Sequence, residues 1–67
     1  MSTENNQYLA TLYIEGYTDQ VQDIKPRDWF YNHLEKVVYF WGRTDASEGR
    51  EMDDINNILN KITNHDI

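Results

Sequence analysis

The stretch PRDWFYNHLEKVVYFWG, residues 26–42, decides the fold that the sequence predicts. It holds both tryptophans and both phenylalanines of the chain, and two of its five tyrosines. On a helix with about 100° between successive residues, its apolar side chains fall within about 200° of arc: Trp29, Phe30, Tyr31, Leu34, Val37, Val38, Phe40 and Trp41. Pro26 suits the first position of a helix, and Gly42 suits a left-handed stop. We therefore expect one long helix over 26–41.

Part of this stretch also fits a strand. Residues 37–41, VVYFW, are of the types that favour strands, so a strand there is the alternative. No turn residue separates Glu35 from Val37, which favours the helix. In that helix His33 lies at the edge of the apolar arc close to Trp29, where we expect a partly buried histidine with an ordinary hydrogen bond.

Two shorter patterns precede the aromatic stretch. Residues 1–7 are polar, and we expect them to be disordered. Residues 8–15, YLATLYIE, alternate as a strand does, and Gly16 ends the pattern. Residues 17–25, YTDQVQDIK, fit either a strand or a loop.

A single strand leaves its backbone groups unpaired, so the strand over 8–15 needs a partner. Residues 17–24 are one candidate within the chain, and residues 37–41 are another. The third candidate is the same strand of a second copy, which would make the protein a homodimer.

The C-terminal third predicts a second helix. Residues 43–49, RTDASEG, form a polar linker in which Asp45 with Glu48, or else Ser47, has the chemistry of a helix cap. From there to residue 64 the apolar side chains recur on one side of a helix: Met52, Ile55, Ile58, Leu59 and Ile62. Residues 65–67 are expected to fray. We find no internal repeat in the sequence.

These patterns predict an α+β fold in a single domain over 8–64. A small single-layer sheet, containing the strand 8–15, would pack with two amphipathic helices over about 26–41 and 48–64. A chain of 67 residues can build only a small core, and it has no cysteine to staple it. The high aromatic content, 13%, increases the area that each buried residue contributes.

Composition excludes several classes of function. Twelve acidic residues against six basic ones give a net charge of −6, and the basic residues form no run. Binding to nucleic acid or to an anionic membrane relies on Lys and Arg, so neither is expected. The N-terminus has no apolar signal segment and the chain no membrane-spanning run. The absence of cysteine fits a reducing compartment, and we expect a cytoplasmic protein.

No catalytic, cofactor or metal site is expected. The acidic residues between 45 and 54 lie near a helix start, where carboxylates serve as caps, and no pair sits in an evident apolar pocket. The two histidines are too few for a structural zinc site, and no glycine-rich phosphate loop is present. The chain therefore reads as a protein without enzymatic activity.

The aromatic set and the acidic run suggest a small protein-binding module. It would be an accessory or inhibitory factor of the kind that phages and mobile elements encode, docking an aromatic and acidic surface onto a larger protein. The candidate contacts are Tyr31, Tyr39, Trp41, Arg43, Asp45, Glu48, Asp53 and Asp54. One alternative is a nucleic-acid mimic that blocks a basic DNA- or RNA-binding protein. Another is a small structural or regulatory subunit that acts by assembly.

Overall fold

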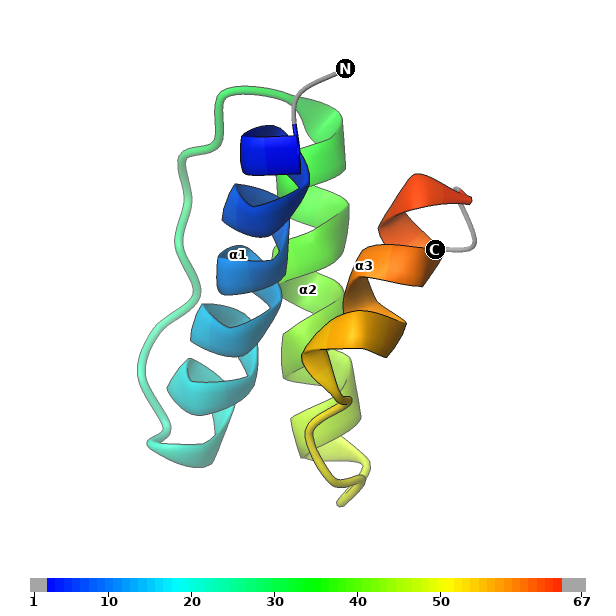
Figure 1. Cartoon of the computed structure of the whole chain (residues 1–67). Coiled ribbons are helices and arrows are strands. Elements are labelled where there is room, and N and C mark those ends of the chain that lie inside the picture. The colour runs from blue at the N-terminus through cyan, green and yellow to red at the C-terminus, as the bar shows by residue number, and fades with distance from the viewer. Residues whose placement is uncertain (1–2, 65–67) are drawn as a thin grey trace.

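The computed structural model describes residues 3–64, which form three helices (Figure 1). Helix α1 covers Thr3–Val21, α2 covers His33–Ser47 and α3 covers Ile55–Thr63. No strand occurs within these described residues, so the predicted α+β fold with a sheet is wrong. The protein has a small all-helical fold.

The predicted strand over 8–15 lies inside α1. Over so short a span its apolar residues fit both the strand period of about 2 residues and the helix period of about 3.6, but only the helix period matches which residues are buried. Leu9, Leu12 and Tyr13 are buried at helical spacing, whereas Tyr8, which strand alternation would place on the same face as Leu12, is exposed. A helix also pairs its own backbone groups, so no partner strand is required. Residues 17–21, predicted as strand or loop, continue the same helix.

The central helix starts later and ends later than the sequence suggests. Its N-cap is Asn32, whose side-chain oxygen accepts a hydrogen bond from the backbone N–H of Glu35 at 2.9 Å. Pro26 therefore lies outside the helix. Gly42 lies buried within α2 rather than ending it, and the left-handed residue after the helix is Gly49, with φ of 76°. Residues 37–41 lie within α2, so the alternative strand there is wrong.

Helix α3 is shorter than the predicted helix over 48–64. Asp54 is its N-cap and accepts a hydrogen bond from the backbone N–H of Asn56 at 3.2 Å. The residues first considered as caps, Asp45 and Ser47, belong to α2 instead.

The predictions for the chain ends and for the domain have different outcomes. Residues 3–7, within the stretch expected to be disordered, begin α1, and residues 65–67 lie outside the described part. The expectation of one domain over 8–64 stays a prediction.

Helices α1 and α2 run parallel, and residues 22–32, here called the crossover, climb back beside them (Figure 1). Parallel neighbours require the chain to return over the length of α1, which is about 28 Å for 19 residues at 1.5 Å each. The crossover can span that distance only when it is extended, at roughly 3.3 Å per residue. This requirement explains why the aromatic residues 29–31 are not helical.

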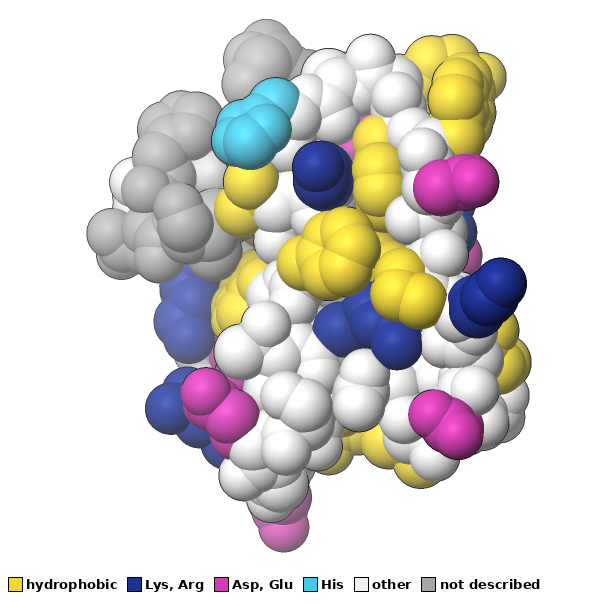
Figure 2. All heavy atoms as spheres, turned by 180° about the vertical axis from the view of Figure 1, so that it is seen from behind, with side chains coloured by type: hydrophobic (Ala, Val, Ile, Leu, Met, Phe, Trp, Pro, Cys, Tyr) yellow, Lys and Arg dark blue, Asp and Glu magenta, His cyan; other side chains and the backbone are white. Residues whose placement is uncertain are grey.

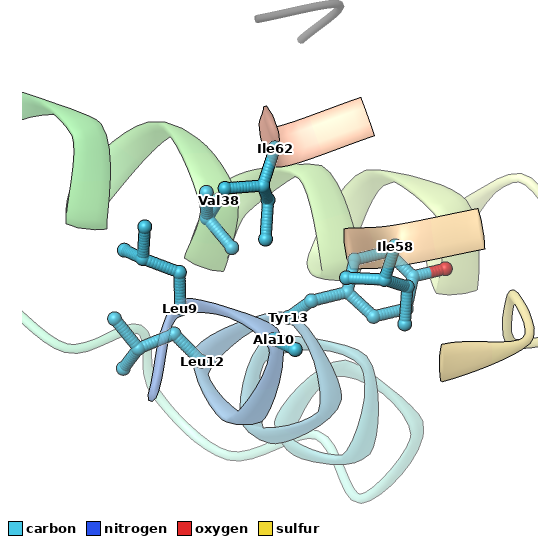
Figure 3. Packing of buried hydrophobic residues seen from close by; sticks show 7 residues of the cluster. All are labelled: Leu9, Ala10, Leu12, Tyr13, Val38, Ile58 and Ile62. Carbon is cyan, nitrogen blue, oxygen red and sulfur yellow. The ribbon is translucent and has the colours of Figure 1, made fainter. Parts of the chain in front are cut away.

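The core lies where the three helices meet (Figure 3). Its buried apolar residues are Leu9, Ala10, Leu12 and Tyr13 of α1, Val38 of α2, and Ile58 and Ile62 of α3. Helix α3 contributes one stripe at i, i+4 spacing and thereby closes one side of the α1–α2 pair. Neither tryptophan belongs to this cluster, although Trp41 packs against it.

Two glycines allow α1 and α2 to touch backbone to backbone. A Cβ on Gly16 would overlap the carbonyl oxygen of Tyr39 and lie 3.0 Å from its carbonyl carbon. A Cβ on Gly42 would overlap the carbonyl oxygen of Tyr13 in the same way and lie 2.9 Å from the backbone nitrogen of Tyr17. The contact is therefore reciprocal, with each helix offering a glycine to a tyrosine carbonyl of the other.

This reciprocity reveals an internal repeat that the sequence analysis missed. Residues 13–19, YIEGYTD, and residues 39–45, YFWGRTD, share the pattern Tyr-x-x-Gly-x-Thr-Asp. The phenol of Tyr13 donates to Asp45 Oδ2 at 2.6 Å, and the phenol of Tyr39 donates to Asp19 Oδ2 at 2.6 Å. Each motif therefore supplies the tyrosine for one bond and the aspartate for the other.

The repeat extends into the segments that follow the two helices. The backbone N–H of Asp53 donates to the phenol of Tyr13 at 3.2 Å, and that of Arg27 donates to the phenol of Tyr39 at 3.3 Å. Equivalent residues are 26 positions apart in every case, as Tyr13 is from Tyr39. An approximate two-fold relation thus exchanges α1 with α2, and the crossover with the segment that leads into α3.

Candidate protein-binding surface

Two of the predicted contact residues are structural. Tyr39 and Asp45 are buried, with exposed fractions of 0% and 6%, and each takes part in one of the repeat hydrogen bonds. The expectation that the aromatic arc would leave Tyr39 at the surface is therefore wrong. Neither side chain is placed to contact a partner.

Trp41 and Arg43 are partly buried and are also engaged within the molecule. The Trp41 ring lies 4.4 Å from that of Tyr13, between centroids, and the ammonium of Lys61 lies 5.3 Å from the Trp41 ring. The Arg43 guanidinium donates to the carbonyl oxygen of Ile24 at 3.0 Å and thereby ties the crossover to α2.

The three remaining predicted acids all have partners within the molecule. Glu48 pairs with Arg50 at 3.1 Å, Asp53 pairs with Lys61 at 3.3 Å, and Asp54 caps α3. Lys61 also lies over the Trp41 ring, so the structure brings Asp53 and Trp41 together.

Tyr31 belongs instead to an exposed aromatic pair with Trp29. Their rings meet edge to face, 4.5 Å apart between centroids, while Trp29 is 58% and Tyr31 73% exposed. The cap of α2 holds this pair in place, because the carboxylate of Glu35 accepts a hydrogen bond from the backbone N–H of Tyr31 at 3.2 Å. The wide aromatic arc predicts that Trp29 can remain at the surface, but the predicted contacts leave it out. Asn32 followed by Glu35 is a helix-start pattern that places Trp29 outside the helix.

We call the surface around this pair the aromatic patch, which comprises Trp29, Tyr31, Phe30 and Phe40. The Phe30 and Phe40 rings are 6.3 Å apart, and both are partly exposed. Figure 2 shows apolar side chains on the face opposite that of Figure 1, with Lys and Arg side chains among them. The crossover and α2 carry four of the six Lys and Arg residues of the chain, Lys25, Arg27, Lys36 and Arg43, and the Arg27 guanidinium lies 5.3 Å from the centre of the Phe30 ring.

His33 is exposed at the first position of α2, so the expected partial burial is wrong. Among the described residues, no three of the types His, Cys, Asp and Glu gather as a metal ion would require. None of the helices within residues 3–64 has both the length and the apolar character of a membrane span.

The fold and this surface define a small all-helical protein with an exposed aromatic patch. The sequence matches no protein-family model, and no similar curated protein or solved structure is found. Function must therefore be argued from the surface itself.

The buried phenols predict a loss of stability in alkali. Burial, together with the hydrogen bond to Asp45, raises the pKa of Tyr13 above its ordinary 10.0, and burial with the bond to Asp19 raises the pKa of Tyr39 likewise. Below pH 10 both phenols are neutral whether the chain is folded or not. Above it the unfolded chain loses protons that the folded chain keeps. The free energy of unfolding should then fall by up to about 1.4 kcal/mol per pH unit for each tyrosine.

Urea unfolding between pH 8 and pH 11.5 measures this effect. Because Tyr13→Phe removes one of the two phenols, its stability should fall less steeply with pH than that of the natural chain. Equal slopes would show that the Tyr13 phenol is not responsible.

Proposed function

We propose that the protein is a non-enzymatic binding module that docks the aromatic patch onto a larger protein. The observation that carries this proposal is the exposure of Trp29 and Tyr31, which form an edge-to-face pair on an 8.0 kDa chain. A chain this small gains by burying its largest side chains, and half-exposed tryptophan is unusual without a partner. Tryptophan and tyrosine are also the residues that most often dominate binding energy at interfaces.

The pair is also suited to binding because little flexibility is lost when it docks. Tyr31 precedes the N-cap of α2, and its backbone N–H is held by the Glu35 carboxylate. Arg43 anchors the crossover at its other end through the Ile24 carbonyl. A partner would therefore meet rings on a segment fixed at both ends, which reduces the entropy cost of association.

The alternative of nucleic-acid mimicry receives less support from the geometry. A mimic must present carboxylates together on one face, in the place of phosphates. Here Asp45 is buried against Tyr13, and Glu48 and Asp53 pair with cations. The accessory or inhibitory role and the cytoplasmic location remain parts of the proposal, the latter resting on the absence of cysteine.

Capture experiments with matched variants test the proposal. The natural chain, immobilised, should retain at least one protein from a lysate of the cells that carry its gene. The double variant Trp29→Ala, Tyr31→Ala should bind it about thirtyfold more weakly, because truncating a central aromatic anchor typically costs about 2 kcal/mol or more. Both side chains are exposed, so circular dichroism should show the same helix content.

Val21→Ala is the matched control, since Val21 is another exposed apolar residue, outside the patch, at the end of α1. It should retain as much partner as the natural chain. Capture that is equal in the double variant, or lost equally in the control, would contradict the assignment of binding to the aromatic patch.

A further inference from the structure

The internal repeat gives the α1–α2 pair two related sides, and only one of them carries a helix. On the first side α3 is seated, with Ile58 and Ile62 in the core. On the second side, the crossover corresponds to the segment that leads into α3, and the chain then continues into α2, so no helix of this chain is seated there (Figure 1). An extended segment covers less surface than a helix, and the aromatic patch remains open beside it.

The repeat also identifies which residues correspond to the seat of α3. On α1, Ala10 lies in the core with Ile58 and Ile62, and Ile14 and Tyr17 pack against that cluster. The equivalent positions on α2, at the repeat interval of 26 residues, are Lys36, Phe40 and Arg43. They have helical i, i+4, i+7 spacing and form one stripe, in which Lys36 is exposed and Phe40 and Arg43 are partly exposed.

The Lys36–Phe40–Arg43 stripe of α2 differs in charge from the equivalent surface of α1, on which α3 packs. An alanine and a tyrosine beneath α3 are replaced by a lysine and an arginine, while the apolar position between them is retained as Phe40. Lys25 of the crossover adds a further exposed cation. In the part of the chain whose side chains are described, residues 6–64, neither Lys25 nor Lys36 pairs with a carboxylate.

We propose that this second seat receives an acidic amphipathic helix of the partner protein, which lies along the Lys36–Phe40–Arg43 stripe against Trp29 and Tyr31. The inference rests on the proposed function and names the chemistry of its partner. The apolar face of that helix would contact Phe40 and the exposed aromatic pair, as the isoleucines of α3 contact the core on the related side. Its carboxylates would meet Lys36 and Lys25.

A second copy of this chain is a poorer occupant. If the patch met itself in a two-fold dimer, the cations Lys25 and Lys36 would meet the same cationic surface of the second copy. If it met the acidic segment before α3 of another copy, the contact would be head to tail and would give rings or filaments rather than a dimer. Nucleic acid is disfavoured because the chain carries a net charge of −6.

Titration of the full chain with helical peptides tests the inference by nuclear magnetic resonance. The first peptide carries isoleucines four positions apart, as in α3, flanked by glutamates, and the second has lysines in place of the glutamates. The acidic peptide should shift the Trp29 indole signal and the amide signals of α2 from Lys36 to Arg43, and the basic peptide should not. Added salt should weaken the binding.

Matched charge changes locate the interaction. Lys36→Glu should weaken binding of the acidic peptide about fivefold or more, because a cation at the contact becomes a repelling carboxylate. Arg50→Gln removes an exposed cation outside the stripe, which pairs with Glu48 and Asp45, and should change binding less than twofold. Circular dichroism should show that both variants keep their helix content.

Three outcomes would overturn the inference: equal binding of both peptides, shifts confined to α3, or no shift with either peptide. Concentration-dependent sedimentation of the chain alone, abolished by Trp29→Ala, would instead assign the patch to a second copy. The capture of a partner from lysate, and its dependence on Trp29, is a separate measurement that none of these results would change. Failure of the helix inference can therefore be distinguished from failure of the binding proposal.

Discussion

Gly16→Ala and Gly42→Ala are each expected to leave the chain largely unfolded at 25 °C. The added methyl group would overlap a tyrosine carbonyl oxygen of the facing helix, and backbone cannot move aside as a side chain can. Helices α1 and α2 would have to separate by about 1 Å or more to restore an ordinary C···O contact of about 3.3 Å. That separation would stretch both repeat hydrogen bonds and open the core between Leu9 and Val38.

The size of the effect follows from comparing two opposing terms. Alanine is the better helix former by about 1 kcal/mol, so helix propensity alone predicts that both substitutions stabilise the protein. Overpacking of a rigid contact costs about 1–3 kcal/mol or more, and here it also disrupts the main helix–helix interface. A core of this size supplies only about 3–5 kcal/mol, so the loss is comparable to the whole stability.

Gly49→Ala is the control for this prediction. Gly49 has φ of 76°, where alanine is strained, but nothing lies within 4 Å of the position its Cβ would take. The cost there should be about 1 kcal/mol, and the chain should remain helical by circular dichroism. If Gly16→Ala and Gly42→Ala unfold in urea no earlier than Gly49→Ala, the close contact of the two helices is not essential.

Tyr13→Phe is expected to destabilise the protein by about 2–3 kcal/mol, the second largest effect. It removes the donor to Asp45, which is only 6% exposed, and the acceptor for the backbone N–H of Asp53. A buried carboxylate that loses its hydrogen-bond donor bears a large desolvation cost, which the distant guanidinium of Arg50, 3.8 Å away and 68% exposed, offsets only in part.

Tyr39→Phe is the matched comparison, because the repeat gives it the same bond to Asp19. Asp19 is partly exposed, so water can replace the lost phenol, and the cost should be about 1 kcal/mol. Urea midpoints at pH 7 measure both variants. Equal costs, or a larger cost for Tyr39→Phe, would contradict the role assigned to burial of the aspartate.

The sequence shows clearly that helices form, but it shows less clearly at which residues they begin and end. The stretch 26–41 contains most of α2, yet Pro26, the predicted helix start, lies outside it, and Asn32 and Glu35 supply the cap. In the C-terminal third the apolar period predicted α3, while the acids before it were assigned to the helix rather than to the segment that precedes its Asp54 cap. Caps are chosen by local hydrogen bonds, and several residues in each segment could make them.

The binding surface was predicted only in part for a different reason. Tyr31 and Tyr39 are alike by residue type, yet one is 73% exposed and the other is buried. The difference in exposure depends on the extended crossover, which is required because α1 and α2 are parallel. Parallel pairing follows from contacts between residues that are far apart in the sequence, such as Tyr13 with Gly42 and Tyr39 with Gly16, and no local pattern encodes those contacts.

The sequence by itself determined the composition-level properties, which are the acidic charge, the lack of thiols and the large aromatic content, and it determined the apolar stripe of α3. It also contained the repeated Tyr-x-x-Gly-x-Thr-Asp motif, but a match this short has no structural meaning until the two copies face one another. Only the tertiary structure decided that residues 8–15 are helical and that Trp29 is exposed. The physical reason is that both outcomes depend on which backbone lies against Gly16 and Gly42, a contact made between distant parts of the chain.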